Sequence, residues 1–234
     1  MTRRHASTIL LTAALVSAVL AACGGSSGGS SSGPPSNGLS SKSPTQILAA
    51  VQAATAKLQS VHVVGTLASG GQTIKLDMSL GKNGADGSLD ENGLSFQLIV
   101  INGTAYLKGS KAFLAKFAGS AASLFAGKWL KFNAGTPNSA QLTQLGNINA
   151  LFGKVLHTTS TVTKGTTTTL NGQPVVELIS KAKGGTMYIA GTGPAYPLQL
   201  TKSGAGGGTV RFDQFNQALH LTPPAGALDV SALS

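Results

Sequence analysis

The sequence predicts an α+β protein: one large antiparallel sheet of about 10–11 strands with helices gathered on one face. Two-residue turns such as Asn92-Gly93, Asn102-Gly103 and Asn171-Gly172 join several strand-like runs, and such turns make consecutive strands antiparallel. Helical patterns are confined to the start and the middle of the folded part. The chain shows no strand–helix–strand alternation of the kind that indicates a parallel sheet.

The folded part is predicted to begin with a helix at Ser43-Pro44, because Ser is a favoured N-cap and Pro is favoured in the first turn. Apolar residues then recur at helical spacing through about 16 residues: Ile47, Leu48, Val51, Ala54 and Leu58. From Val61 the period of the pattern changes to two, which predicts strands. The five expected strands are 61–67, 74–80, 85–91, 94–101 and 105–108.

The middle of the chain returns to helical spacing twice, at 111–126 and at 140–156, with a short strand expected at 127–132 between them. Strands resume in the threonine-rich stretch that follows, because β-branched side chains favour extended backbone. The expected strands of this half are 157–170, 175–180, 186–189, 197–202, 209–212 and 219–222.

The first 22 residues are interpreted as a signal peptide. Arg3 and Arg4 precede an apolar run of 14 residues, 9–22, which is too short to span a bilayer comfortably. The run ends in Leu20-Ala21-Ala22-Cys23, which resembles the bacterial lipobox, whose cysteine takes a diacylglyceryl group. We therefore expect lipidation of Cys23 and anchoring to the membrane. The other interpretation is ordinary cleavage near Ala22, leaving Cys23 an idle thiol.

Residues 23–42 are expected to be the lipidated cysteine and a flexible tether. Seventeen of the twenty residues 24–43 are Gly, Ser or Pro, so no apolar period exists there to build a core. Such a chain has a root-mean-square reach of about 25 Å. The sequence thus divides into a signal peptide at 1–22, a tether at 23–42 and one folded domain at 43–234.

Composition excludes several classes of protein. A single cysteine rules out a disulfide framework. The chain carries 17 basic and 7 acidic residues, a net charge of +10. Its lysines are scattered without runs or interleaved aromatics, so we expect no nucleic-acid partner. Anionic headgroups or cell-wall polymers suit an exported basic protein better; the other interpretation is that the lysines only keep the surface soluble and protect edge strands from pairing.

No motif for catalysis or metal binding is found in the sequence. His62, His157 and His220 are far apart, and none has a partner at metal-ligand spacing. We therefore expect no metal or other cofactor, no catalytic residues and no enzymatic activity. A catalytic cluster assembled only in the fold stays open as an alternative.

The outstanding feature is a set of apolar residues on one face of the sheet and on the facing helices. Periodicity alone cannot separate a packed core from the wall of a cavity, so both interpretations stand at this point. The candidate cavity residues are Ile74, Leu76, Met78, Leu80, Leu94, Phe96, Leu98, Val100, Phe113, Phe117, Leu124, Phe125, Leu151 and Phe152.

A family resemblance adds to these observations. The lipobox, the tether, the opening helix and the hairpin-rich sheet occur here together with Gly127-Lys128-Trp129, Tyr196-Pro197-Leu198 and a closing strand near 209–215. Over residues 43–230 the chain resembles the actinobacterial LppX/LprA/LprF/LprG-type lipoproteins, which are similar in fold to the carriers LolA and LolB. It departs from the better-known members in its low charge and its Gly/Thr-rich second half.

The resemblance implies a curved antiparallel half-barrel with helices filling its mouth, and a space between sheet and helices that holds acyl chains. It further implies a monomeric protein on the outer face of the plasma membrane that carries or presents a lipid or glycolipid in the cell envelope. An envelope transporter is then a candidate partner. Two alternatives remain: a solid-core lipoprotein that binds protein or cell wall through its surface, and an envelope hydrolase.

Overall fold

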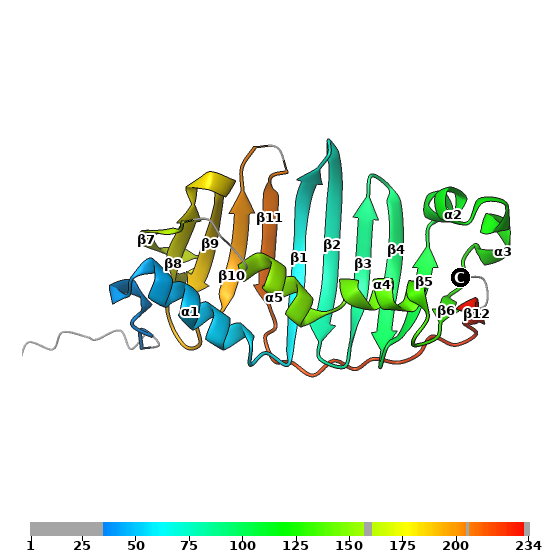
Figure 1. The fold of residues 1–234 in the computed structure, drawn as a ribbon, viewed down its shortest axis with the longest axis horizontal. Coiled ribbons are helices and arrows are strands. Elements are labelled where there is room, and N and C mark those ends of the chain that lie inside the picture. The colour runs from blue at the N-terminus through cyan, green and yellow to red at the C-terminus, as the bar shows by residue number, and fades with distance from the viewer. Residues whose placement is uncertain (1–34, 157–160, 205, 232–234) are drawn as a thin grey trace, which may run out of the picture. The chain divides into compact units, whose positions relative to one another are not determined.

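A single sheet of twelve strands dominates the computed structural model (Figure 1), which describes residues 35–156, 161–204 and 206–231. The strand order is β12-β6-β5-β4-β3-β2-β1-β11-β10-β9-β8-β7. In the first half the strands are β1 (Ser60–Ser69), β2 (Gln72–Gly81), β3 (Gly84–Glu91), β4 (Leu94–Ile101), β5 (Thr104–Gly109) and β6 (Leu130–Phe132). In the second half they are β7 (Thr163–Leu170), β8 (Gln173–Ser180), β9 (Gly185–Ala190), β10 (Pro197–Lys202), β11 (Gly208–Asp213) and β12 (Leu228–Asp229).

Two series of hairpins, one from each half of the sequence, are joined where β1 pairs with β11. Every pairing in the sheet is antiparallel except that of β12 with β6. The expected α+β plan with one large curved sheet is therefore confirmed. The predicted strand at 219–222 is wrong: these residues form no strand, and the chain instead reaches the far edge of the sheet as β12.

The hairpin turns are those that the Asn-Gly pairs predict. Asn92, Asn102 and Asn171 have φ values of 51°, 48° and 51°, and the glycine after each is also left-handed. Positive φ at both central positions produces the turn whose twist matches that of the flanking strands. These three turns fix the register of β3–β4, β4–β5 and β7–β8.

The first helix, α1 (Pro44–Thr55), begins with the N-cap Ser43 and the first-turn Pro44 that the sequence predicts. The structure adds a capping box: the Ser43 hydroxyl accepts from the Gln46 amide, and the Gln46 side chain accepts from the Ser43 amide. At 12 residues it is shorter than the 16 expected, because the chain turns at 56–58 before β1.

The expected helix at 111–126 is two short helices, α2 (Lys111–Phe117) and α3 (Ala122–Phe125), separated by the 3-10 turn Gly119–Ala121. Gly119 adopts a φ of 52°, which an uninterrupted helix does not contain. The expected helix at 140–156 is likewise divided into α4 (Pro137–Leu145) and α5 (Ile148–Leu156) by Gly146 and Asn147.

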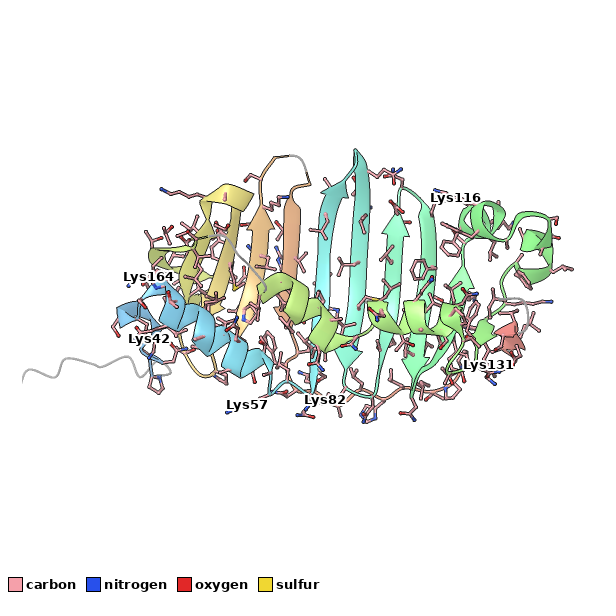
Figure 2. All side chains as sticks on the ribbon, viewed as in Figure 1. Lys42, Lys57, Lys82, Lys116, Lys131 and Lys164 are labelled. Carbon is pink, nitrogen blue, oxygen red and sulfur yellow. The ribbon has the colours of Figure 1, made fainter. Side chains whose placement is uncertain are left out.

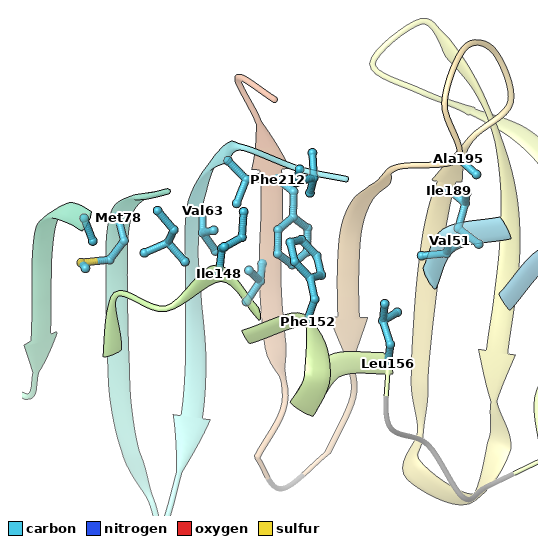
Figure 3. Packing of buried hydrophobic residues seen from close by; sticks show 14 of the residues in the cluster. Val51, Val63, Met78, Ile148, Phe152, Leu156, Ile189, Ala195 and Phe212 are labelled. Carbon is cyan, nitrogen blue, oxygen red and sulfur yellow. The ribbon is translucent and has the colours of Figure 1, made fainter. Parts of the chain in front are cut away.

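Helices α1, α5 and α4 lie across one face of the sheet (Figure 1), while α2 and α3 lie at its β5–β6 end. Lysines lie along the whole length of the sheet (Figure 2), as expected from their scattered positions in the sequence. The main core lies between the sheet and the helices, where Phe152 of α5 contacts Phe212 of β11 at 5.6 Å between ring centroids (Figure 3). This core joins both halves of the sheet.

Candidate functional site

Thirteen of the fourteen apolar residues expected to line a cavity fall into three groups in the structure. The first group is fully packed between the sheet and α5, with exposed fractions of 1–7%. Its members are Met78, Leu80, Leu98, Val100 and Phe152. Close packing of this kind leaves no room for a ligand among Met78, Leu80, Leu98 and Phe152, so these side chains hold the sheet and helices together.

The second group forms a half-buried apolar row across three strands. Leu76 of β2 faces Leu89 of β3, which in turn faces Phe96 of β4. Ile74 and Leu94 lie one step further along the same face and are also only partly covered, as is Leu151 on α5. Sequence reasoning omitted Leu89, although its place in the alternating pattern of β3 could have revealed it.

The third group lines a groove at the β5–β6 end of the sheet, which we call the end groove. Its volume is about 600 Å³, within the range of roughly 300–1,000 Å³ that is usual for ligand sites. Phe113, Phe117 and Phe125 are the predicted residues that line it. The structure adds apolar residues from α2, β5, β6, α4 and the chain end: Leu107, Leu114, Leu130, Phe132, Leu142 and Val230.

The geometry of α2 places the aromatic side chains of the end groove. The Ser110 hydroxyl caps this helix by accepting from the Phe113 amide at 3.2 Å. Phe113 and Phe117 are then one turn apart on the same side, with ring centroids 4.6 Å apart. Phe113 also contacts Phe96 at 5.2 Å. An aromatic series thus connects the half-buried row of the sheet to the groove.

The end groove opens to solvent, because Phe117 lines it and yet is 63% exposed. Its polar lining comes from two amides of α4, Asn138 and Gln141. Leu124, which was also predicted to line the cavity, does not line the groove and is 64% exposed. Such a lining suits an apolar ligand with an uncharged polar end.

Another cavity, smaller than the end groove at about 290 Å³, lies between α1, α5 and the second half of the sheet. Its apolar lining includes Leu48, Val155, Leu178, Met187 and Leu200. None of these five was among the predicted cavity residues. The sequence predicted the strands and helices that carry these residues. It did not predict that these elements pack against one another, because that depends on how the two halves of the sheet join.

The opposite face of the sheet carries a charged cluster that the sequence did not reveal. His62 of β1 contacts Asp77 of β2 through Nε2 at 2.8 Å and Asp213 of β11 through Nδ1 at 2.7 Å. Burial acts to lower the pKa of His62, but its hydrogen bonds to the two carboxylates outweigh this and raise the pKa above 6.5. His62 is therefore held towards its charged form between two acids.

This cluster does not have the geometry of a hydrolase triad. Ser79 is the register partner of His62, but both ring nitrogens of His62 are engaged by carboxylates, so neither is left to take a proton from a serine. Among the described residues no group of three or more His, Cys, Asp and Glu side chains could hold a metal ion. The part of the chain that the structure describes also contains no helix long and apolar enough to cross a membrane.

Cys23 and residues 24–34 lie outside the described residues, so the lipobox and most of the tether remain predictions. No family model matches the sequence, and no curated protein matches it. Among solved structures, LprF from Mycobacterium bovis is similar with a TM-score of 0.56 and 17% identity, covering 83% of this chain and 100% of LprF. The lipoprotein LppX from Mycobacterium tuberculosis gives a TM-score of 0.48 at 17% identity, covering 76% and 99% of the two chains.

The likeness to LprF confirms, at the level of the fold, the resemblance to LppX/LprF-type lipoproteins that the sequence suggests. At 17% identity it shows the fold alone. The assignment of a ligand must therefore come from the surfaces and cavities of this chain.

Proposed function

We propose that this protein is an exported, membrane-anchored lipoprotein that binds the acyl part of a lipid or glycolipid in the end groove and carries or presents it in the cell envelope. The observation that carries this proposal is the end groove itself: about 600 Å³, lined mainly by aromatic and aliphatic side chains, and open beside a strongly exposed phenylalanine.

Binding would be non-covalent and driven by removal of apolar surface from water. Each buried methylene group contributes about 0.8 kcal/mol, so an acyl segment of moderate length supplies enough free energy for stable binding. The groove offers no charged side chain for a headgroup, and only Asn138 and Gln141 supply hydrogen bonds. We therefore propose that acyl chains are recognised mainly by shape and length, and that the headgroup stays near solvent.

Anchoring would come from acylation of Cys23, which places the domain on the outer face of the plasma membrane. A tether of the length of residues 24–43 allows a reach of about 25 Å. The domain could then meet the membrane surface, or an envelope transporter that supplies or accepts the lipid, while it remains attached as a monomer.

The proposal is tested by photo-crosslinking in cells. The full chain is produced in an actinobacterium fed with a diazirine fatty acid, irradiated and purified, and crosslinked peptides are mapped by mass spectrometry. We expect crosslinks in peptides that contain Phe113, Phe117 or Phe125. Native mass spectrometry of the unirradiated protein should show one lipid per chain, which tandem mass spectrometry then identifies.

Two matched variants make this experiment specific. Ala121 lines the end groove, so Ala121→Trp should fill it and abolish crosslinking. Ala115 is exposed on α2 and does not line the groove, so Ala115→Trp should leave crosslinking unchanged. Equal crosslinking in the two variants, or a lipid-free protein, would reject the groove as the binding site. The densely packed main core would then favour a protein- or wall-binding module.

A further inference from the structure

Exposed apolar side chains gather at the end of the sheet where the end groove opens. Among the described residues four large hydrophobic side chains are exposed, and Phe117, Leu124 and Leu228 are three of them, at 63%, 64% and 37%. Phe117 belongs to α2, Leu124 to α3, and Leu228 begins β12 beside β6. Exposed apolar residues concentrated in one place indicate an interaction surface.

Basic side chains predominate around these residues. The chain contains no acidic residue between Glu91 and Glu177, a stretch with seven lysines. Lys111 and Lys116 of α2 and Lys128 after α3 are exposed, and the Lys116 ammonium lies 5.6 Å from the centre of the Phe117 ring. Figure 2 shows Lys116 beside α2. The acid at this end, Asp229, faces Lys131 at 3.6 Å.

We propose that the segment Lys111–Lys128, here called the α2–α3 lobe, docks on an anionic phospholipid surface. Phe117 and Leu124 would enter the boundary between headgroups and acyl chains, and the three exposed lysines would contact lipid phosphates. This inference rests on the proposed function, which tethers the domain beside a membrane. Positive charge flanking exposed apolar side chains is complementary to such a surface, and this is what favours a membrane over a protein partner.

Docking in this orientation has a direct consequence for lipid transfer. Phe117 both lines the end groove and is exposed on the lobe, so its insertion would place the groove opening against the bilayer. An acyl chain could then move between the bilayer and the groove with little exposure to water. The lobe would thus determine which face of the tethered domain meets the membrane.

Trp129, the only tryptophan of the chain, reports on this contact. It follows Lys128, and its carbonyl accepts from the Leu228 amide at 2.8 Å.

The full lipidated chain is reconstituted in vesicles with brominated acyl chains, made either of phosphatidylcholine or of phosphatidylcholine with phosphatidylglycerol. We expect at least about twofold stronger quenching of Trp129 in the anionic vesicles, and loss of this difference at about 1 M salt, where the screening length is about 3 Å.

Matched variants assign the effect to the lobe. Replacing Lys111, Lys116 and Lys128 together by Glu should remove the dependence on anionic lipid, whereas the same change at the exposed Lys57, Lys82 and Lys202 should preserve it. Phe117→Ser with Leu124→Ser should reduce quenching, and Leu145→Ser, at the fourth exposed hydrophobic side chain, should not.

Two results would overturn docking. One is an absence of quenching in both kinds of vesicle. The other is quenching of equal strength in both kinds that is insensitive to salt, as expected for a brominated chain held in the groove. Crosslinking to the groove lining can persist in either case, so failure of docking is distinguishable from failure of lipid binding.

Discussion

His62 makes two side-chain contacts that its position in the sequence does not suggest. Its side chain is 18% exposed and lies between Asp77 on β2 and Asp213 on β11. The cluster therefore spans three adjacent strands, including the β1–β11 pair that joins the two halves of the sheet. A charged imidazole donates to both carboxylates at once, so protonation of His62 and cohesion of this junction are linked.

This linkage predicts a pH dependence of stability. The pKa of His62 is raised in the folded protein above its usual value of 6.5. The stabilisation is therefore fully present below about pH 6.5 and is lost as the pH rises through the folded-state pKa. We expect His62→Gln to lower the free energy of unfolding by about 1 kcal/mol at low pH, since both carboxylates are well exposed, and by less at high pH.

Chemical denaturation at about pH 6 and about pH 9 measures this difference. His220→Gln, at an exposed histidine in the C-terminal segment, controls for loss of a histidine in general. A His62→Gln effect that is the same at both pH values would show that the cluster does not act through the charge of His62.

The sequence could not predict this cluster, because Asp77 is 15 and Asp213 is 151 residues from His62. Which acids lie beside His62 depends on the register of β1 with two different strands. The β1–β2 hairpin could be anticipated from its turn, but nothing local specifies the pairing of β1 with β11. The same holds for the end groove. Helical spacing predicts that Phe113 and Phe117 share one side of a helix, but it cannot predict that Val230, more than 100 residues later in the sequence, lines the same groove.

At the scale of elements, two glycines differ in the space available for a side chain: Gly65 in a strand and Gly153 in a helix. Gly65 lies in β1 where it meets β11, and a Cβ atom there would be 2.3 Å from the Thr209 carbonyl oxygen and 2.7 Å from the Val210 Cα. Gly153 lies inside α5, where, apart from its chain neighbours and the backbone of its own helix, no atom is within 4 Å of a Cβ position. The first glycine permits close pairing of strands, while the second only weakens a helix.

Alanine substitutions should therefore change stability in opposite directions. Gly65→Ala should destabilise the fold by about 1–3 kcal/mol, because the crowding is with backbone atoms that cannot rotate away. Gly153→Ala should stabilise it by about 0.5–1 kcal/mol through helix propensity and reduced chain entropy. Urea denaturation of both variants checks this pair. Destabilisation by Gly153→Ala would mean that the exposed face of α5 carries a contact that the structure lacks.

Glycines also explain where the predicted elements and the observed ones differ. The apolar spacing at 111–126 and 140–156 predicts continuous helices, but Gly119 in the first and Gly146 in the second interrupt them. Hydrophobic periodicity indicates which side of an element faces the protein and continues across a break of this kind, so it cannot by itself place the break. The division at Gly119 is what forms the compact α2–α3 lobe beside the end groove.

At the scale of all the described residues, α1, α4 and α5 lie across one face of the sheet (Figure 1), and cavities are found beside them. The tightly packed core joins the two halves at their centre, with cavities on either side of it. The sequence predicted the sheet, the helical face and the apolar residues between them. It could not predict which of these residues are buried, because the distinction between a core and a cavity depends on where the helices lie along the strands.

Lipid binding to the end groove should stabilise the whole fold, because a ligand that binds only the folded state shifts the unfolding equilibrium. At a free lipid concentration of about 100 times Kd the gain is about 2.7 kcal/mol, which raises Tm by roughly 5–10 °C for a chain of this size. Differential scanning calorimetry of the full chain, delipidated and then reloaded with its own extracted lipid, measures this shift. Ala121→Trp should show no shift on addition of lipid, whereas Ala115→Trp should behave as the unaltered protein does. The calorimetric result is independent of crosslinking chemistry. If lipid raised the Tm of Ala121→Trp as much as that of the unaltered protein, the lipid would bind outside the end groove. The smaller cavity beside Leu48 and Met187 would then be the next site to test by substitution.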